Sequence, residues 1–157
     1  MSVTTLRPPR VLFLCVANAA RSQMAEGIAR SLWGEHAVVQ SAGSRPSRVH
    51  PLAVAVLGEI RIDATQHHSK HVDAIDPASI DVVITLCAEE ECPVFLGRAA
   101  RLSWAMPDPD RREDVLAGSS AGAEEALDDA ARLNQFRATR DALRTRLQEW
   151  QAAGYPV

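Results

Sequence analysis

The stretch RVLFLCVANAARSQMAEGI, residues 10–28, decides the fold of this chain. It opens with an apolar run over residues 11–14, of the kind that forms a strand buried on both faces. Met24, Ile28 and Leu32 then recur at the spacing of an amphipathic helix. This order predicts a strand, a polar turn and a helix, with the turn at the carboxyl end of the strand.

The turn carries Cys15 and Arg21, separated by five residues and followed by Ser22. Backbone N–H groups of such a turn point inward, the helix contributes its positive end, and a guanidinium offers a planar fork for two oxygens. We therefore expect residues 15–21, the oxyanion loop, to wrap a tetrahedral oxyanion. A thiol in that field is stabilised as a thiolate, so Cys15 is a candidate nucleophile, with Ser22 as its hydrogen-bond partner or as a helix cap. The alternative is a cysteine that serves only as a small buried hydrophobe.

The composition is that of an ordinary globular protein. The chain has 157 residues, enough for one domain, of which 46% are hydrophobic and 24% charged. A net charge of -3 gives no electrostatic case for nucleic acid or an anionic membrane as a partner. No apolar run approaches the ~20 residues of a membrane span, and residues 1–9 lack the apolar core of a secretion signal. We expect a cytoplasmic protein with a flexible leader over residues 1–9 and a single domain over residues 10–157.

Strands and helices alternate along the rest of the chain. Residues 37–40 predict a second strand, and the turn-rich residues 41–46 predict a loop that either supports the oxyanion loop or merely connects. Further elements are expected as a helix over 50–57, strands over 81–87 and 102–106, a flexible loop over 111–123 and a long helix over 124–150. The alternation predicts a three-layer α/β sandwich around a parallel sheet, with its site at the carboxyl ends of the strands.

Two further cysteines lie in the second half of the chain. Cys87 ends the apolar strand DVVITLC, and Cys92 follows in an acidic loop. Because parallel strands end at the same edge, we expect Cys87 to lie beside Cys15. A thiolate that attacks an oxyanion can be attacked by a second thiol, and a third thiol can take over the resulting disulfide. The cysteines therefore predict a relay, and their odd number favours a reducing compartment.

Two carboxylates, Asp108 and Asp110, follow the last predicted strand in a proline-rich turn. Either one is a candidate general acid that donates a proton to a leaving oxygen. An Asp-Pro pair is also a common turn opener, so the pattern leaves both a catalytic and a purely structural interpretation.

A family resemblance covers residues 10–147. It rests on VLFLCVANAARSQMAEG, SAGS, HHS, ITLC, CPVF and WAMPDP, at residues 11–27, 41–44, 67–69, 84–87, 92–95 and 104–109. These segments resemble the arsenate reductases, many of them thioredoxin-coupled, that are related to low-molecular-weight protein tyrosine phosphatases. The resemblance implies a four-stranded parallel sheet flanked by helices, with flavodoxin-like topology, and reduction of arsenate to arsenite.

The same resemblance implies roles for the residues of the oxyanion loop. Cys15 becomes the nucleophile, Arg21 and Ser22 stabilise the oxyanion and the thiolate, and Asn18 shapes the loop. Arsenate, or phosphate or sulfate as its mimic, is then held by Cys15, Val16, Ala17, Asn18, Ala19, Ala20 and Arg21.

The relay follows from the resemblance in the same way. Asp108 becomes the general acid, Cys87 the thiol that attacks arsenylated Cys15, and Cys92 the thiol that frees Cys15 in a final disulfide. The segment between Cys87 and Cys92 is shorter than in well-known thioredoxin-coupled members, so the donor stays open between thioredoxin and a low-molecular-weight thiol. Ala20 stands where many relatives have a further cysteine, which excludes a side disulfide in the loop.

No cofactor is required by this chemistry. Some members of the family hold a potassium ion near the loop, and the matching positions here are Asn18, Glu26, Ser41 and Asp63.

Two other functions stay open. A low-molecular-weight phosphatase that hydrolyses phosphate monoesters through a phosphocysteine needs only Cys15, Arg21 and Asp108. A non-enzymatic sensor would use the thiols to bind arsenic, an oxyanion or zinc, since the spacings Cys87-x4-Cys92 and His67-x3-His71 each match half a zinc site.

Overall fold

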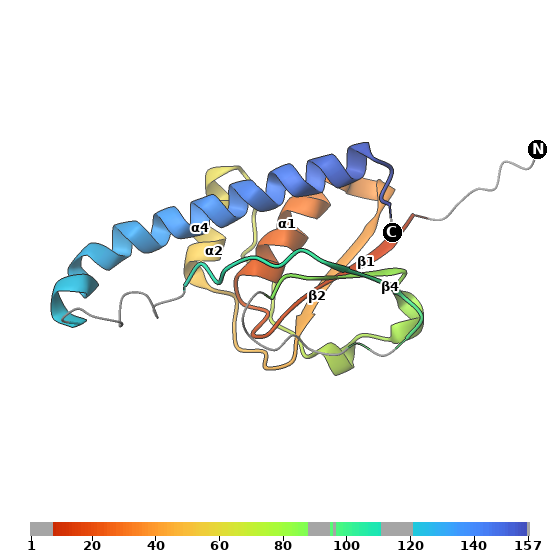
Figure 1. Ribbon diagram of the computed structural model, residues 1–157, viewed down its shortest axis with the longest axis horizontal. Helices are drawn as coiled ribbons and strands as arrows, with labels where there is room; N and C mark the ends of the chain where they lie inside the picture. The colour runs from red at the N-terminus through yellow and green to blue at the C-terminus, as the bar shows by residue number, and fades with distance from the viewer. Residues whose placement is uncertain (1–7, 88–94, 96, 111–120, 157) are drawn as a thin grey trace, which may run out of the picture.

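The computed structural model describes residues 8–87, 95, 97–110 and 121–156, and for residues 121–128 only the backbone (Figure 1). Most of the predicted leader, most of the predicted loop over 111–123, and Cys92 lie outside the described residues. Among the helices that are described, none combines the length and apolarity that a membrane crossing requires.

A four-stranded parallel sheet forms the centre of the fold. Its strands run in the order β2-β1-β3-β4, with bounds β1 Arg10–Cys15, β2 Val38–Gly43, β3 Val82–Thr85 and β4 Ala100–Ser103. β1 lies between β2 and β3 and is buried from Val11 to Cys15, as its continuous apolar run predicts. The predicted α/β fold class is confirmed.

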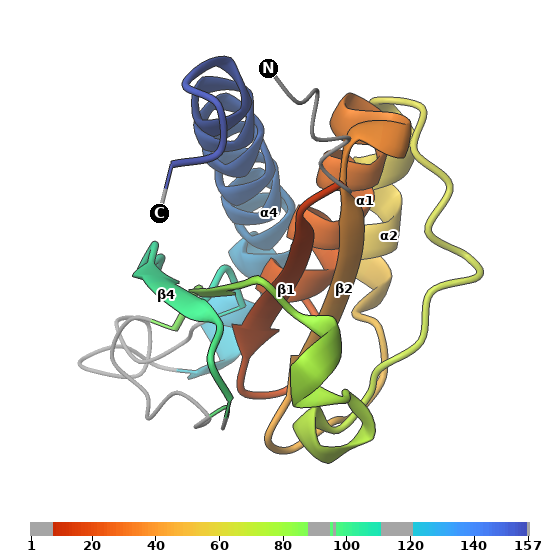
Figure 2. The same cartoon turned by 90° about the vertical axis from the view of Figure 1, so that its right-hand side faces the viewer.

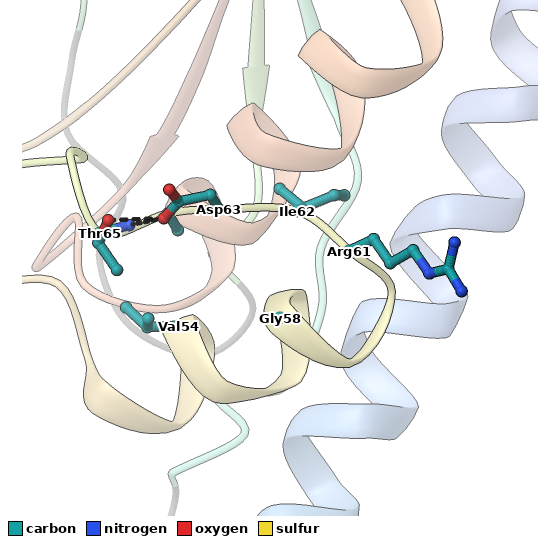
Figure 3. Close-up of a pocket in the computed structure, with 7 residues that line it drawn as sticks. Val54, Gly58, Arg61, Ile62, Asp63 and Thr65 are labelled. Atoms are coloured by element: carbon teal, nitrogen blue, oxygen red, sulfur yellow. Dashed lines mark hydrogen bonds between the residues drawn. The ribbon is translucent and has the colours of Figure 1, made fainter.

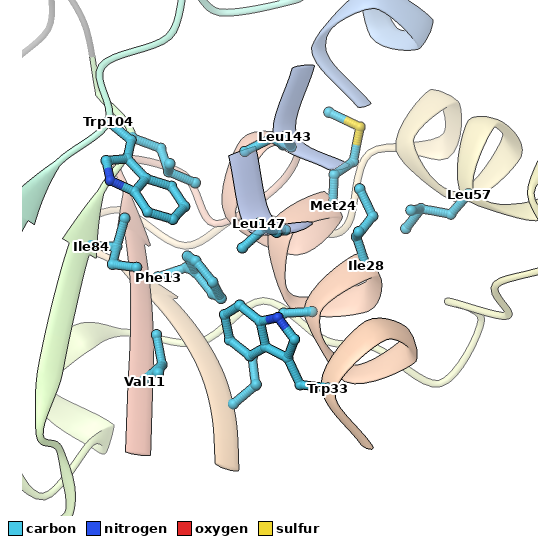
Figure 4. Packing of buried hydrophobic residues seen from close by; sticks show 14 of the residues in the cluster. Val11, Phe13, Met24, Ile28, Trp33, Leu57, Ile84, Trp104, Leu143 and Leu147 are labelled. Atoms are coloured by element: carbon cyan, nitrogen blue, oxygen red, sulfur yellow. The ribbon is translucent and has the colours of Figure 1, made fainter. Parts of the chain in front are cut away.

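In the described part of the chain, one face of the sheet is covered by α1 (Arg21–Trp33), α2 (Pro51–Glu59) and α4 (Ala121–Ala152) (Figures 1 and 2). Val11 and Phe13 of β1 pack on this side, together with Trp33 of α1 and Leu143 and Leu147 of α4 (Figure 4). Because side chains alternate along a strand, Leu12 and Leu14 point to the opposite face.

On the opposite face, the described residues form short 3-10 turns. They are η2 (Val72–Ala74) and η3 (Pro77–Ser79), and their neighbours Ile75 and Ile80 pack with Leu12 and Leu14. These turns complete the third layer of the sandwich.

Several boundaries differ from the predicted ones. β2 continues to Gly43, because Ser41, Ala42 and Gly43 pair in register with the last three residues of β1; the turn-rich segment starts only after it. β4 begins and ends earlier than the predicted 102–106, since it pairs residue by residue with β3 from Ala100. α4 begins at Ala121, inside the stretch predicted as a loop.

Candidate active site

Cys15 lies at the end of β1 and is only 2% exposed. Its Sγ is 2.9 Å from the hydroxyl oxygen of Ser22, in the first turn of α1. That hydroxyl oxygen also accepts a hydrogen bond from the side-chain amide of Asn18, at 2.7 Å. Either group can donate in this bond while Cys15 is a thiol; once Cys15 is a thiolate it has no hydrogen to give, so the Ser22 hydroxyl donates to the sulfur and stabilises its charge.

Asn18 holds the shape of the oxyanion loop. It is completely buried, and its backbone has a positive φ of 49°, a conformation that asparagine tolerates better than most residues. Its side-chain oxygen accepts from Nε2 of Gln23 at 3.0 Å and from the backbone N–H of Lys70 at 2.9 Å. Its amide nitrogen donates to Ser41 at 3.0 Å as well as to Ser22.

The segment after β2 supports the loop from outside. The carbonyl oxygens of Val16 and Ala17 accept hydrogen bonds from the backbone N–H groups of Arg45 and Ser47, at 2.9 and 3.2 Å. These carbonyl oxygens therefore face away from the loop interior. Of the two interpretations of this segment, the supporting one is confirmed.

A pocket of ≈ 240 Å³ opens above Cys15. The oxyanion loop contributes Cys15, Ala17, Ala19, Ala20 and Arg21 to its wall, and the other lining residues are Ser47, His50, Asp108 and Asp110. The candidate nucleophile Cys15, Arg21 and both candidate acids thus line one cavity. Ser47 and His50 were not foreseen; the position of His50 directly before the helix-starting Pro51 was the available signal.

Arg21 is buried at the edge of this pocket, at 4% exposure. Its Nη1 donates to the carbonyl oxygen of Met106 at 3.0 Å and to that of Leu86 at 3.3 Å. Leu86 directly precedes Cys87, and Met106 lies two residues before Asp108. One guanidinium therefore connects the oxyanion loop with the segments that carry the second cysteine and the candidate acid.

The two candidate acids have different surroundings. Asp110 accepts hydrogen bonds on both oxygens, from Arg132 of α4 at 2.7 Å and from Nε2 of His50 at 3.0 Å. His50 donates through Nε2, because its Nδ1 accepts from the backbone N–H of Leu52.

Asp108 accepts on Oδ1 from the backbone N–H of Asp110, at 2.9 Å. Its other oxygen has no hydrogen-bond partner in the described part of the chain. Only Asp108 therefore has an oxygen available to a leaving group in the pocket.

Cys87 follows β3 at the same edge of the sheet. The register pairs Leu14 with Thr85, and the N–H of Leu86 donates to the carbonyl oxygen of Leu14 at 2.9 Å. Cys87 is buried and disulfide-bonded, whereas Cys15 is a free thiol. The expected neighbourhood of the two strand ends is present; Cys92 is outside the described residues.

Three of the four positions matched to a potassium site are hydrogen-bonded to one another, and the fourth, Asp63, has other partners. Asn18, Ser41 and Glu26 form a buried hydrogen-bonded chain, in which Ser41 donates to Glu26. Asp63 is exposed and lines a separate hollow beside α2, where its carboxylate accepts two hydrogen bonds from Thr65 (Figure 3). These bonds lower the pKa of Asp63. The donor set is incomplete, so the residues present do not fit a potassium ion in the implied way.

The histidines proposed as half a zinc site have other contacts. His67 binds the side-chain oxygen of Gln23 at 3.0 Å, and His71 accepts from the backbone N–H of Asp73 at the start of η2. Burial lowers the pKa of His67. Among the residues that the structure describes, no group of three or more His, Cys, Asp or Glu side chains is placed to hold a metal.

Comparisons with known proteins agree with this geometry. Residues 10–153 match the model of the low molecular weight phosphotyrosine protein phosphatase family. The arsenate reductase of Bacillus subtilis (strain 168) is 33% identical over 146 residues, 92% of this chain and 96% of that protein. A solved arsenate reductase in the phosphate binding state has a TM-score of 0.71 at 31% identity, covering 92% of this chain and 98% of that one.

A second solved structure is the thioredoxin-dependent arsenate reductase Cg_ArsC1' of Corynebacterium glutamicum. It is 25% identical, with a TM-score of 0.65, and the match covers 96% of this chain and 63% of that one. With the matched family model spanning the whole described sheet and pocket, this chain belongs to the low molecular weight phosphotyrosine protein phosphatase family.

Proposed function

We propose that this protein reduces arsenate to arsenite in the cytoplasm through a relay of Cys15, Cys87 and Cys92. The observation that carries the proposal is the position of Cys15 inside an oxyanion loop, next to a strand end that delivers a second cysteine. A hydrolytic phosphatase needs only the loop and a general acid, and has no use for that second thiol.

In the first step, the pocket holds arsenate as an analogue of phosphate. Arg21 and the N-terminus of α1 balance its charge, and the thiolate of Cys15 attacks arsenic. An arsenic–sulfur bond forms and an arsenic–oxygen bond breaks, while Asp108 supplies the proton with which that oxygen leaves as water.

In the second step, the thiolate of Cys87 attacks the sulfur of Cys15. The new disulfide forms as the arsenic–sulfur bond breaks, and its electron pair remains on arsenic, which leaves as arsenite. Cys92 then attacks Cys87 and releases Cys15 as a thiolate. Because one thiol meets two partners, the segment after β3 has to move during the cycle.

The disulfide at Cys87 beside the free thiol of Cys15 is the arrangement expected at the end of this cycle. A thiol donor then returns the relay to its reduced form. Thioredoxin is our first choice, because a related solved structure is described as thioredoxin-dependent. A low-molecular-weight thiol is the second choice.

The test is arsenate-dependent oxidation of NADPH with thioredoxin and thioredoxin reductase, for the wild type and for Cys15→Ser, Cys87→Ser and Cys92→Ser. The chain holds three cysteines, so the set is complete. We expect all three variants to lose multiple turnover, while the Cys87→Ser and Cys92→Ser variants keep slow hydrolysis of p-nitrophenyl phosphate. Full arsenate turnover by Cys87→Ser would refute the relay and leave a phosphatase.

A further inference from the structure

Glu26 is a buried carboxylate beneath the oxyanion loop. It is 2% exposed, and a buried charge is costly unless it is paired and hydrogen-bonded. The hydroxyl of Ser41 donates to Oε1, and the guanidinium of Arg30 lies 2.7 Å from Oε2. The ammonium of Lys70 lies 3.9 Å from Oε1. The charge of Glu26 is therefore compensated from two sides by cations of this chain.

Lys70 reaches the same loop through its backbone. Its N–H donates to the side-chain oxygen of Asn18 at 2.9 Å, and its carbonyl oxygen accepts from the N–H of Gly43 at the end of β2. Asn18 in turn donates to Ser22, which faces the sulfur of Cys15. Lys70 thus hydrogen-bonds Asn18 through its backbone, while its ammonium donates to the carbonyl oxygen of His68 at 3.1 Å and forms a longer ion pair with Glu26.

The surroundings of Glu26 do not favour an added cation. Arg30 and Lys70 together carry two positive charges against one negative charge, so a further cation near Oε1 meets net repulsion. The side-chain oxygens of Asn18 and Ser41 are already engaged in the hydrogen-bonded chain, and the carboxylate of Asp63 accepts its hydrogen bonds from Thr65. An ammonium is itself a compact monovalent cation with three donors.

We propose that Lys70 is a positioning residue whose ammonium takes the place of a potassium ion under the oxyanion loop, which makes oxyanion binding and turnover independent of potassium. Through Glu26, Ser41 and Asn18 it keeps the loop in its binding conformation. The part of the proposal that concerns turnover rests on the proposed arsenate reduction; the part that concerns oxyanion binding does not.

Burial lowers the pKa of Lys70, in line with an ammonium that is partly withdrawn from water. Its side chain is 21% exposed, whereas that of Arg30, which pairs with the other oxygen of Glu26, is 52% exposed. Arg30 hydrogen-bonds Val39 of β2 and, among the described residues, makes no hydrogen bond to the oxyanion loop. It faces Oε2 of Glu26, whereas Lys70 and Ser41 face Oε1, so Arg30 is the control for losing a positive charge at the same carboxylate.

The experiment measures the affinity for inorganic phosphate by calorimetry, and arsenate turnover separately, in sodium and potassium buffers of equal ionic strength. The wild type is expected to change by less than about twofold between the two salts. Lys70→Met removes the charge while keeping most of the side-chain volume. In sodium, this variant should bind phosphate about tenfold more weakly, the loss typical when a residue that holds a ligand-binding group in place is removed. In potassium, it should recover most of that affinity. Arg30→Met should show no such rescue, and Lys70→Arg should resemble the wild type.

Potassium activation of the wild type, or a Lys70→Met variant that matches the wild type in both salts, would overturn the proposal. If Lys70→Met does not fold, Lys70→Gln serves in its place, and the wild-type comparison still decides the potassium independence. Phosphate binding without arsenate turnover would refute the proposed function and leave this inference to be judged on the binding data alone.

Discussion

The guanidinium of Arg21 donates a hydrogen bond to the carbonyl oxygen of Leu86, the residue directly before Cys87. The arginine that is expected to bind the oxyanion is thus also a backbone tether of the second cysteine. An incoming tetrahedral anion offers the guanidinium charge-assisted hydrogen bonds, which are stronger than a bond to a neutral carbonyl. A bound oxyanion therefore competes with the carbonyl oxygen of Leu86 for the guanidinium of Arg21. Loss of the bond to Leu86 would free the segment that carries Cys87 to move.

Substitution of Arg21 by lysine tests the double role. An ammonium keeps the charge but cannot offer a planar fork and hold a backbone carbonyl at the same time. We expect kcat/KM for arsenate to fall by about 10²–10³, the typical loss when one charge-stabilising donor is removed. Steady-state kinetics measures it, with Arg30→Lys on the exposed side of α1 as the control. Near-normal kcat/KM for Arg21→Lys would contradict the assignment.

The assignment of the general acid is tested by a matched pair, Asp108→Asn and Asp110→Asn. Loss of a positioned acid typically costs 10²–10⁴ in rate, so we expect Asp108→Asn to lower the single-turnover rate by about that factor. Asp110→Asn should lower the single-turnover rate by less than about tenfold. Both oxygens of Asp110 already accept hydrogen bonds, from His50 and Arg132, so this carboxylate helps to hold the pocket in shape. The reverse ranking would reassign the acid to Asp110.

Gly43 is required where β2 approaches the oxyanion loop. A Cβ at this position would lie 2.4 Å from the carbonyl oxygen of Val16 and 2.9 Å from the backbone N of Asn18. Because both contacts are backbone atoms, we expect Gly43→Ala to lower the free energy of unfolding by about 1–3 kcal/mol, as overpacking does.

The control for Gly43→Ala is Gly58→Ala in α2, where a Cβ meets nothing within 4 Å. This change should leave stability unchanged or raise it by about 0.4–1 kcal/mol, because alanine restricts the unfolded chain. Urea unfolding of both variants measures the difference. Equal effects of the two substitutions would mean that the close approach at Gly43 is relieved without cost.

The half-buried imidazole of His67 makes stability depend on pH. Burial lowers its pKa below the usual 6.5, so between the folded and unfolded pKa values the unfolded chain binds more protons than the folded one. Stability is then fully present above the unfolded pKa and is lost as pH falls below about 6.5 toward the lowered folded value.

His67→Asn keeps a donor for Gln23 and removes the titration. We expect its free energy of unfolding to fall less between pH 7 and pH 5 than that of the wild type, as measured by urea unfolding across this range. The exposed neighbour His68 supplies the control, since His68→Asn should retain the wild-type pH dependence. A parallel loss in all three proteins would show that His67 is not the group responsible.

The sequence alone determined the parts of this protein that depend on local pattern. The apolar run over residues 11–14 and the helical spacing of Met24 and Ile28 predicted β1 and α1, because burial on a strand or along a helix follows a fixed period. The spacing of Cys15 and Arg21 predicted the oxyanion loop, and the end of the next apolar strand predicted where Cys87 lies. These features need no knowledge of distant contacts.

Only the tertiary structure decided which carboxylates are already hydrogen-bonded or ion-paired and which remain available to a substrate. Asp108 and Asp110 have similar local sequences, and only Arg132 from α4 and His50 before α2 distinguish them. In the same way, Glu26 pairs with Lys70, whereas Asp63, which matched the family pattern, hydrogen-bonds Thr65. Such pairs lie far apart in the chain and form only when the helices pack on the sheet, so no periodic signal in the sequence records them.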